Sequence, residues 1–362
     1  MDLEERVEHV GSLVAPQRLV DALARSADRS AGGESLAEVE DDCIREVVAR
    51  QEARGLGVVT DGELRRLRGR DEVAAQLADV PRFGVARGRR LPAGEHRSGV
   101  SIKRTAFASD TPFGVPANSL VDEFLFTAGI STRPVKVALL GPDHVTHLLD
   151  PAPGAHVHDL FDAVLALEQT VVEDVVAAGC RHVQLDSPGY LAYADPVCVA
   201  EMRGRGIDPV ADLRQAIEAD NAVVAGAGEA TVSLHMCRSY LRGVARSPAF
   251  DPFAEILFDQ LVHRRLLVDL DLSQADAFAP LRFVPRDRQV VIGVVDSRNP
   301  RVETIEEVLR LVEHAGRWFP IDQLALSPTC GFAASDPARQ IGAEEQWRKL
   351  DVLVEVASRV WG

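Results

Sequence analysis

Eight short apolar runs alternate with longer segments of helical periodicity along this chain of 362 residues, and this alternation predicts a (β/α)8 barrel. A second observation supports the barrel: polar residues and potential metal ligands directly follow the apolar runs, as they do at the carboxyl ends of barrel strands. An open doubly wound sheet is the alternative. That fold calls for a glycine-rich phosphate turn after an early strand, and no G-x-G-x-x-G stands there.

The predicted elements follow one another as strand and helix from the N-terminus to the C-terminus. The strand candidates are residues 7–10, 58–60, 135–140, 182–185, 231–234, 266–268, 290–295 and 324–326. The clearest helical segments, rich in Ala, Glu and Arg, are residues 36–54, 159–178, 208–225, 304–317 and 344–360. We therefore expect one barrel domain over residues 1–362.

One segment, residues 81–116, interrupts the alternation. It holds seven basic residues (Arg82, Arg87, Arg89, Arg90, Arg97, Lys103 and Arg104) against Glu95 and Asp110. Long insertions in compact domains are lids, binding loops or disordered segments. We expect an insertion or lid here. A basic lid would suit an anionic substrate, and a solvated hairpin that balances surface charge is the alternative.

Composition excludes several classes of protein. A net charge of −15 argues against binding to nucleic acid or to an anionic membrane surface. No apolar stretch approaches the ~20 residues of a membrane span, and the N-terminus has no basic and apolar signal pattern. Five scattered cysteines do not form a disulfide framework, so we expect the reducing cytoplasm. A homo-oligomer is compatible with all of this.

His235 and Cys237 are the most informative pair of residues. They stand two apart at the end of the strand candidate 231–234, so they point to the same side, and zinc takes such nitrogen and sulfur ligands. Asp269 and Cys330 also follow strand candidates. Asp, Gly, Ser and Pro at strand ends also form turns and helix caps, but His and Cys are poor turn formers. Glu255 and Asp259 are alternative carboxylates for the site.

With these residues in view, the chain resembles the catalytic half of cobalamin-independent methionine synthase. The matching stretches are His9-Val-Gly-Ser12, Val59-Thr-Asp-Gly-Glu63, Leu140-Gly-Pro142, Val183-Gln-Leu-Asp186, His235-Met-Cys237, Gly293-Val-Val-Asp-Ser297 and Leu326-Ser-Pro-Thr-Cys-Gly-Phe332. The resemblance implies a Zn²⁺ cofactor held by His235, Cys237 and Cys330. Asp269 stands where the family usually has Glu as the fourth ligand.

The resemblance also assigns the substrate side of the site. It places Ser12 and Glu63 beside the amino-acid portion of a thiol and Asp186 at its ammonium group, and we expect His9 to line the same pocket. Asp296 and Glu63 are candidates to protonate the leaving group. A role as helix cap or salt-bridge partner explains each of them equally well. Arg298 is a candidate to bind a carboxylate, or else a surface loop residue.

The resemblance implies a zinc-dependent methyltransferase that activates a thiol such as homocysteine as the thiolate. The chain starts directly at the catalytic half, and the family's folate-stacking Trp is not evident after residues 141–142. The alkyl donor therefore stays open between a folate, a corrinoid and another electrophile. The alternatives are addition of a zinc-bound thiol to an epoxide, a related C–S bond-forming or bond-cleaving reaction, and a catalytically lapsed zinc-binding barrel.

Overall fold

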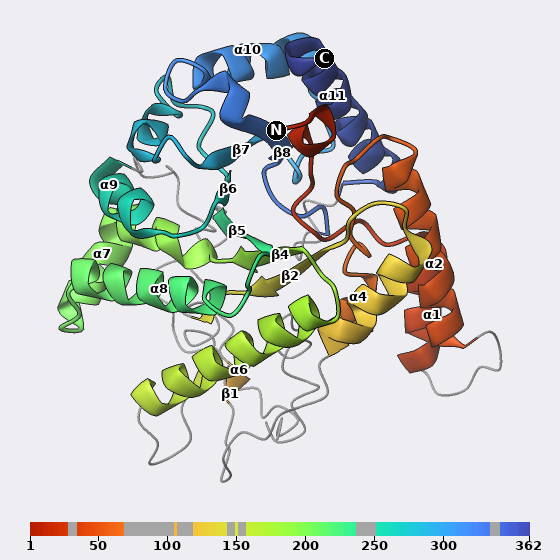
Figure 1. Cartoon of the computed structure of the whole chain (residues 1–362), viewed down its shortest axis with the longest axis horizontal. Coiled ribbons are helices and arrows are strands. Elements are labelled where there is room, and N and C mark those ends of the chain that lie inside the picture. The colour runs from red at the N-terminus through yellow and green to blue at the C-terminus, as the bar shows by residue number, and fades with distance from the viewer. Residues whose placement is uncertain are drawn as a thin grey trace.

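A parallel sheet forms the centre of the molecule (Figure 1). The computed structural model describes residues 1–27, 35–68, 105–106, 119–142, 149–150, 157–236, 251–333 and 341–362. Six strands are adjacent in the order β2, β4, β5, β6, β7 and β8, and every pairing between them is parallel. They span Lys136–Leu140, His182–Asp186, Thr231–Met236, Arg265–Val268, Gln289–Val295 and Leu324–Pro328.

Two shorter extended segments close the sheet into a barrel. Val7 forms a parallel bridge with Leu326 of β8, and Val59 forms one with Val135 beside β2. The two segments also contact each other, because the backbone N–H of Leu13 donates to the carbonyl of Gly62 at 3.0 Å. The predicted (β/α)8 barrel is confirmed. Only the candidates 7–10 and 58–60 differ, since each forms a single bridge instead of a full strand.

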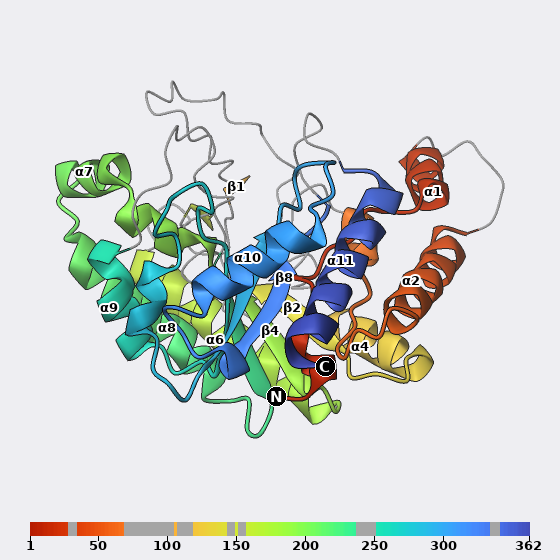
Figure 2. The same cartoon turned by 90° about the horizontal axis from the view of Figure 1, so that it is seen from above.

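Helices surround the strands on the outside (Figures 1 and 2). They are α1 Gln17–Ala27, α2 Leu36–Glu52, α4 Ser119–Ile130, α6 Val157–Ala177, α7 Pro196–Gly204, α8 Pro209–Val224, α9 Asp251–Gln260, α10 Ile305–Ala315 and α11 Ala343–Trp361. Local sequence fixes several starts: Ser35 with Glu38 and Thr304 with Glu307 form capping boxes. None of the described helices has both the length and the apolar character that a bilayer crossing requires.

The two faces of the sheet have different neighbours. Val268, Ile292 and Leu326 belong to a large apolar core together with residues of the surrounding helices. Leu267, Val291 and Ala325, which alternate with them, form a separate small cluster with Val10 inside the barrel. The inward face of these strands therefore packs in a cluster of its own, separate from the core between the strands and the helices.

The basic insertion lies almost wholly outside the described residues. Within residues 81–116 the structure describes only β1, Thr105–Ala106, which pairs in parallel with β3, Leu149–Asp150, in a separate two-stranded sheet. The lid therefore stays a prediction.

Candidate active site

The predicted site residues gather at the carboxyl ends of neighbouring strands. Asp186 ends β4, and His235 is the last residue but one of β5. Asp269 directly follows β6, Asp296 directly follows β7, and Cys330 lies just beyond β8. Since all of these strands are parallel, the topology places the five side chains at one mouth of the barrel, where barrel enzymes hold their catalytic groups.

The His235 ring hydrogen-bonds to Asp186 across the pairing of β4 and β5. Nδ1 of His235 lies 2.9 Å from Oδ1 of Asp186, and the two residues are opposite each other in register. An ionised carboxylate only accepts hydrogen bonds, so a hydrogen bond to it requires a proton on Nδ1, and in the neutral imidazole the lone pair then lies on Nε2. The His235 side chain is 4% exposed and that of Asp186 is 24% exposed. Asp186 therefore both supports the imidazole and faces the mouth.

Asp269 forms a buried ion pair with Arg298. Oδ2 of Asp269 lies 2.9 Å from Nη2 of Arg298, and the aspartate side chain is fully buried. Arg298 is held in turn by Asp296, whose Oδ1 accepts the Arg298 backbone N–H at 2.9 Å and lies 3.7 Å from Nε. Arg298 thus binds a carboxylate, as considered from the sequence, and that carboxylate is the protein's own. Asp296 acts here as a turn residue and salt-bridge partner.

Ser12 packs directly against the loop that carries Cys330. The backbone N–H of Phe332 donates to the Ser12 carbonyl at 2.8 Å. A Cβ atom at Gly331 would collide with the Ser12 hydroxyl as it is placed here, so the two residues are in close contact. The Cys330 thiol is half-buried and reduced. The structure therefore brings one predicted zinc ligand and one predicted substrate-binding residue to the same place.

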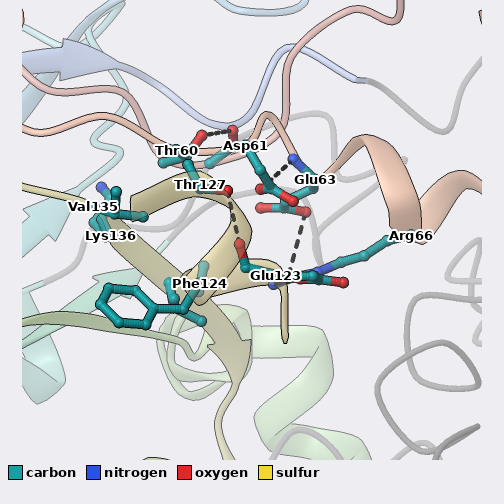
Figure 3. Close-up of a pocket in the computed structure, with 12 residues that line it drawn as sticks. Thr60, Asp61, Glu63, Arg66, Glu123, Phe124, Thr127, Val135 and Lys136 are labelled. Atoms are coloured by element: carbon teal, nitrogen blue, oxygen red, sulfur yellow. Dashed lines mark hydrogen bonds and ion pairs between the residues drawn. The ribbon is translucent and has the colours of Figure 1, made fainter. Parts of the chain in front are cut away.

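Glu63 lines a pocket next to Ser12 (Figure 3). Its backbone has a φ of 58°, which is rare for a residue other than glycine, and its N–H donates to Asp61 Oδ1 at 2.8 Å. Strained backbone of this kind concentrates at functional sites. The Glu63 carboxylate lies against Gly11, where a Cβ would meet its Oε1. Glu63 is therefore held in the pocket by its own turn.

Glu123 of α4 faces Glu63 and Arg66 across this pocket (Figure 3). Arg66 Nη2 lies 3.3 Å from Glu123 Oε2, and Arg66 Nη1 lies 3.7 Å from Glu63 Oε2. Burial raises the pKa of Glu123 to about 7, because it outweighs the opposing effect of Arg66. Sequence reasoning missed Glu123 and Arg66. The available signal was the acidic pair Asp122-Glu123 in an otherwise apolar helix.

His9 lies behind the pocket, in the core. Its side chain is buried, and Nε2 lies 2.8 Å from Oε1 of Gln51 in α2. Burial, aided by the charge of Lys136, lowers the pKa of His9 to about 4. We had expected His9 to line the substrate pocket, whereas the structure uses its ring to join the first extended segment to α2.

Other candidates lie on the surface or outside the described residues. Glu255 and Asp259 are exposed on α9. Cys237 lies beyond the described part of β5, within residues 237–250. Nothing therefore places its thiol relative to His235.

Comparison with known proteins now gives the family. The sequence model of the cobalamin-independent synthase catalytic domain matches residues 10–359. This chain belongs to that family. The uncharacterized protein YxjH of Bacillus subtilis is 30% identical over 364 residues, which cover 98% of this chain and 94% of that protein. A methionine synthase from Saccharolobus solfataricus is 26% identical over 357 residues, covering 96% and 92%.

Solved structures of this synthase family share the fold. A B12-independent methionine synthase from Shewanella sp. W3-18-1 superposes with a TM-score of 0.72 at 18% identity, covering 98% of this chain and 97% of that one. A Listeria monocytogenes protein assigned to the same class gives 0.75 at 21% identity, covering 99% and 98%. Both cover this barrel nearly end to end.

Zinc, the metal that the resemblance implies, suits the donor types of the residues present. His235 has Nδ1 fixed by a carboxylate, which is the usual surrounding of a metal-binding histidine. Cys330 adds a thiol from another strand end, and thiolate with imidazole selects zinc. Among the described residues, no three His, Cys, Asp or Glu side chains form a group that could hold a metal ion. The full ligand set, which includes Cys237, therefore stays a prediction.

Proposed function

We propose that this chain is a zinc-dependent methyltransferase that alkylates a thiol, with homocysteine as the acceptor that fits best. One observation carries the proposal: the carboxylate-supported His235 stands at the same barrel mouth as Cys330 and its contact with Ser12. Membership of the cobalamin-independent synthase family supports the same chemistry. The reduced thiols fit the cytoplasm, where we place the protein.

We assign His235, Cys237 and Cys330 as zinc ligands. Asp269, whose Oδ2 pairs with Arg298, is the proposed fourth ligand. Bound zinc would lower the pKa of a substrate thiol and so favour the thiolate, which is the nucleophile. Arg298 neutralises the buried Asp269 and fixes its orientation, in the manner of groups that surround metal ligands.

The pocket beside Glu63 suits the ammonium group of an amino-acid thiol. Asp61, Glu63 and Glu123 bring three carboxyl groups to a pocket whose lining also includes two cationic residues, Arg66 and Lys136. Oδ2 of Asp61 is buried and has no hydrogen-bond partner among the described residues. A cation that enters would supply the missing donor. Asp186 offers a further carboxylate at the end of β4, so Glu63 and Asp186 would hold the amine together.

Glu63 also fits the role of proton donor to the leaving group. It lies in the pocket, and the rare φ of its backbone holds it there. Asp296, the other candidate, is 48% exposed and engaged with the Arg298 backbone. We therefore favour Glu63 for proton transfer and Asp296 for holding Arg298.

Product analysis by mass spectrometry tests the function directly. Zinc-loaded protein is incubated with a thiol panel that includes homocysteine, together with 5-methyltetrahydrofolate, methylcobalamin, S-adenosylmethionine or a simple epoxide. We expect methionine from homocysteine with one of the methyl donors, and none with the Cys330→Ser variant.

The other outcomes separate the alternative functions. A product from the epoxide alone would replace methyl transfer with epoxide opening. No product and no thiol binding to zinc-loaded protein would overturn the enzyme assignment in favour of a lapsed zinc-binding barrel.

A further inference from the structure

A chain of buried polar side chains runs through the barrel interior up to the candidate metal site. Lys136 Nζ donates to Glu8 Oε2 at 2.6 Å and to Gln184 Oε1 at 2.7 Å. Gln184 Nε2 donates to Asp186 Oδ1 at 2.8 Å, and that oxygen also meets Nδ1 of His235 at 2.9 Å. At the far end, Arg265 Nε donates to Glu8 Oε1 at 2.5 Å. The strands thus connect a pair of buried ions at the barrel floor to the imidazole at its mouth.

The donor and acceptor types of these side chains fix the direction of each hydrogen bond between them. An ammonium group only donates, so Lys136 requires the carbonyl oxygen of Gln184 to face it. The Gln184 amide nitrogen must then face Asp186, and it also donates to the carbonyl of Val10 at 2.7 Å. A flipped amide would set two donors against each other at Lys136 and an oxygen against the carboxylate of Asp186. Lys136 therefore fixes the orientation of Gln184, and Gln184 helps to fix Asp186.

The two carboxylate oxygens of Asp186 have different roles. Within the described part of the chain, its side-chain hydrogen bonds, from Gln184 and from His235, both end on Oδ1. Oδ2 is therefore the oxygen that a substrate ammonium would meet. Without the Gln184 amide, the carboxylate could rotate and present either oxygen to His235.

We propose that Lys136 and Gln184 are positioning residues that set the tautomer and the orientation of His235 for binding a metal through Nε2. This inference rests on the proposed function for its metal. A neutral imidazole in water has two tautomers, and a fixed acceptor at Nδ1 selects the one that leaves the lone pair on Nε2. Hydrogen bonds from Lys136 to Gln184 and from Gln184 to Asp186 hold that acceptor in place on the neighbouring strand β4.

Filling space alone does not require these residues. Removing an ion from water costs several kcal/mol even after relaxation, so a buried charged pair is a poor way to fill a core. Farther round the same barrel, Leu267, Val291 and Ala325 fill the interior with apolar side chains. Polar side chains also lie beneath this apolar cluster, where Arg265 Nη1 donates to Gln289 Oε1 at 2.7 Å, but within the described interior it is the branch through Lys136 and Gln184 that reaches Asp186 and His235.

The test compares two Gln184 variants with a matched control in the full-length protein. Gln184→Met keeps the length of the side chain and removes its three hydrogen bonds, whereas Gln184→Glu accepts from Lys136 but sets a carboxylate against Asp186. Ser233→Ala is the control, because Ser233 is opposite Gln184 in register and donates only to the Val183 carbonyl. Zinc affinity is measured by competition with a chromophoric chelator, and ligand geometry by the visible spectrum of the cobalt-substituted protein.

We expect both Gln184 variants to lose about 10- to 100-fold in zinc affinity with an altered cobalt spectrum, which is the effect of losing a group that supports a metal ligand. The zinc affinity of Ser233→Ala should stay within about threefold of the wild-type value. Unchanged affinity and spectrum in both Gln184 variants would overturn the inference while leaving the proposed function intact. A wild type that binds no zinc would instead overturn the proposed function.

A second measurement decides the question if the variants do not fold. Nitrogen-15 NMR of the histidine rings in zinc-loaded wild type, with His235→Gln to assign the signal, reports which nitrogen carries the proton. We expect Nδ1 of His235 to be protonated and Nε2 to show a metal-bound shift. A metal-bound Nδ1 would contradict the positioning role of the chain.

Discussion

The barrel interior has two sides that share one backbone register and differ in chemistry. A single row across the strands reads Asp186, His235, Leu267, Val291 and Ala325. The first two are polar, hydrogen-bonded to each other and supported from below, whereas the last three pack together as an apolar cluster. The comparison teaches that the same strand architecture gives rigidity on one side and a candidate reactive site on the other.

The largest expected effect is on the free energy of unfolding when Lys136, at the floor of the barrel, is replaced. Lys136→Met leaves Glu8 buried without one of its two cations, so the free energy of unfolding should fall by about 3–5 kcal/mol. Urea denaturation of both proteins measures this. A loss below about 1 kcal/mol would show that the ion pair is not part of a tightly coupled interior.

A substitution on the apolar side should change the free energy of unfolding and leave zinc binding unchanged. Val291→Ala removes two buried methyl groups and leaves a cavity, which should cost about 2–3 kcal/mol of unfolding free energy. Zinc affinity should stay at the wild-type value, since Val291 lies two strands away from His235. A large loss of zinc in this variant would break the distinction between the two sides.

Two histidines extend the comparison to pH. His235 has Asp186 as partner, whereas both ring nitrogens of the buried His263 lack a hydrogen-bond partner among the described residues. Burial lowers the pKa of His263 to about 3. The unfolded chain therefore takes up a proton below about pH 6.5 that the folded chain refuses, and stability falls as the pH is lowered.

Comparison with His263→Leu isolates this effect from other titrating groups. Between pH 8 and pH 5 the wild type should lose about 2 kcal/mol relative to the variant. Parallel stability curves for the two proteins would show that His263 titrates normally in the folded state.

The smallest expected effect concerns the pocket at the mouth. Glu123→Gln removes one of the carboxyl groups around Arg66, so the KM for homocysteine should rise about fivefold, corresponding to about 1 kcal/mol. A thiol of similar length without the amine should show no change, and this matched substrate is the control. An equal rise for both thiols would exclude a role for Glu123 in recognising the ammonium group.

Sequence predicted the strands on both sides of the barrel, but not the contacts between their inward polar side chains. Strands β7 and β8 begin and end within about two residues of the predicted runs, because buried parallel strands are continuous apolar runs. Lys136 and Gln184 were assigned to strands without a further role, since nothing local reveals which inward polar residues meet. The ion pair between Asp269 and Arg298 joins loops 29 positions apart, so only the fold brings them together.

Zinc content is the measurement that tests the central claim most directly. Metal analysis of purified wild type should find about one zinc per chain, and His235→Ala and Cys330→Ser should each lose most of it. Val291→Ala serves as the control for general damage to the barrel and should keep its zinc. A full complement of zinc in both ligand variants would contradict the assignment of this barrel mouth as the metal site.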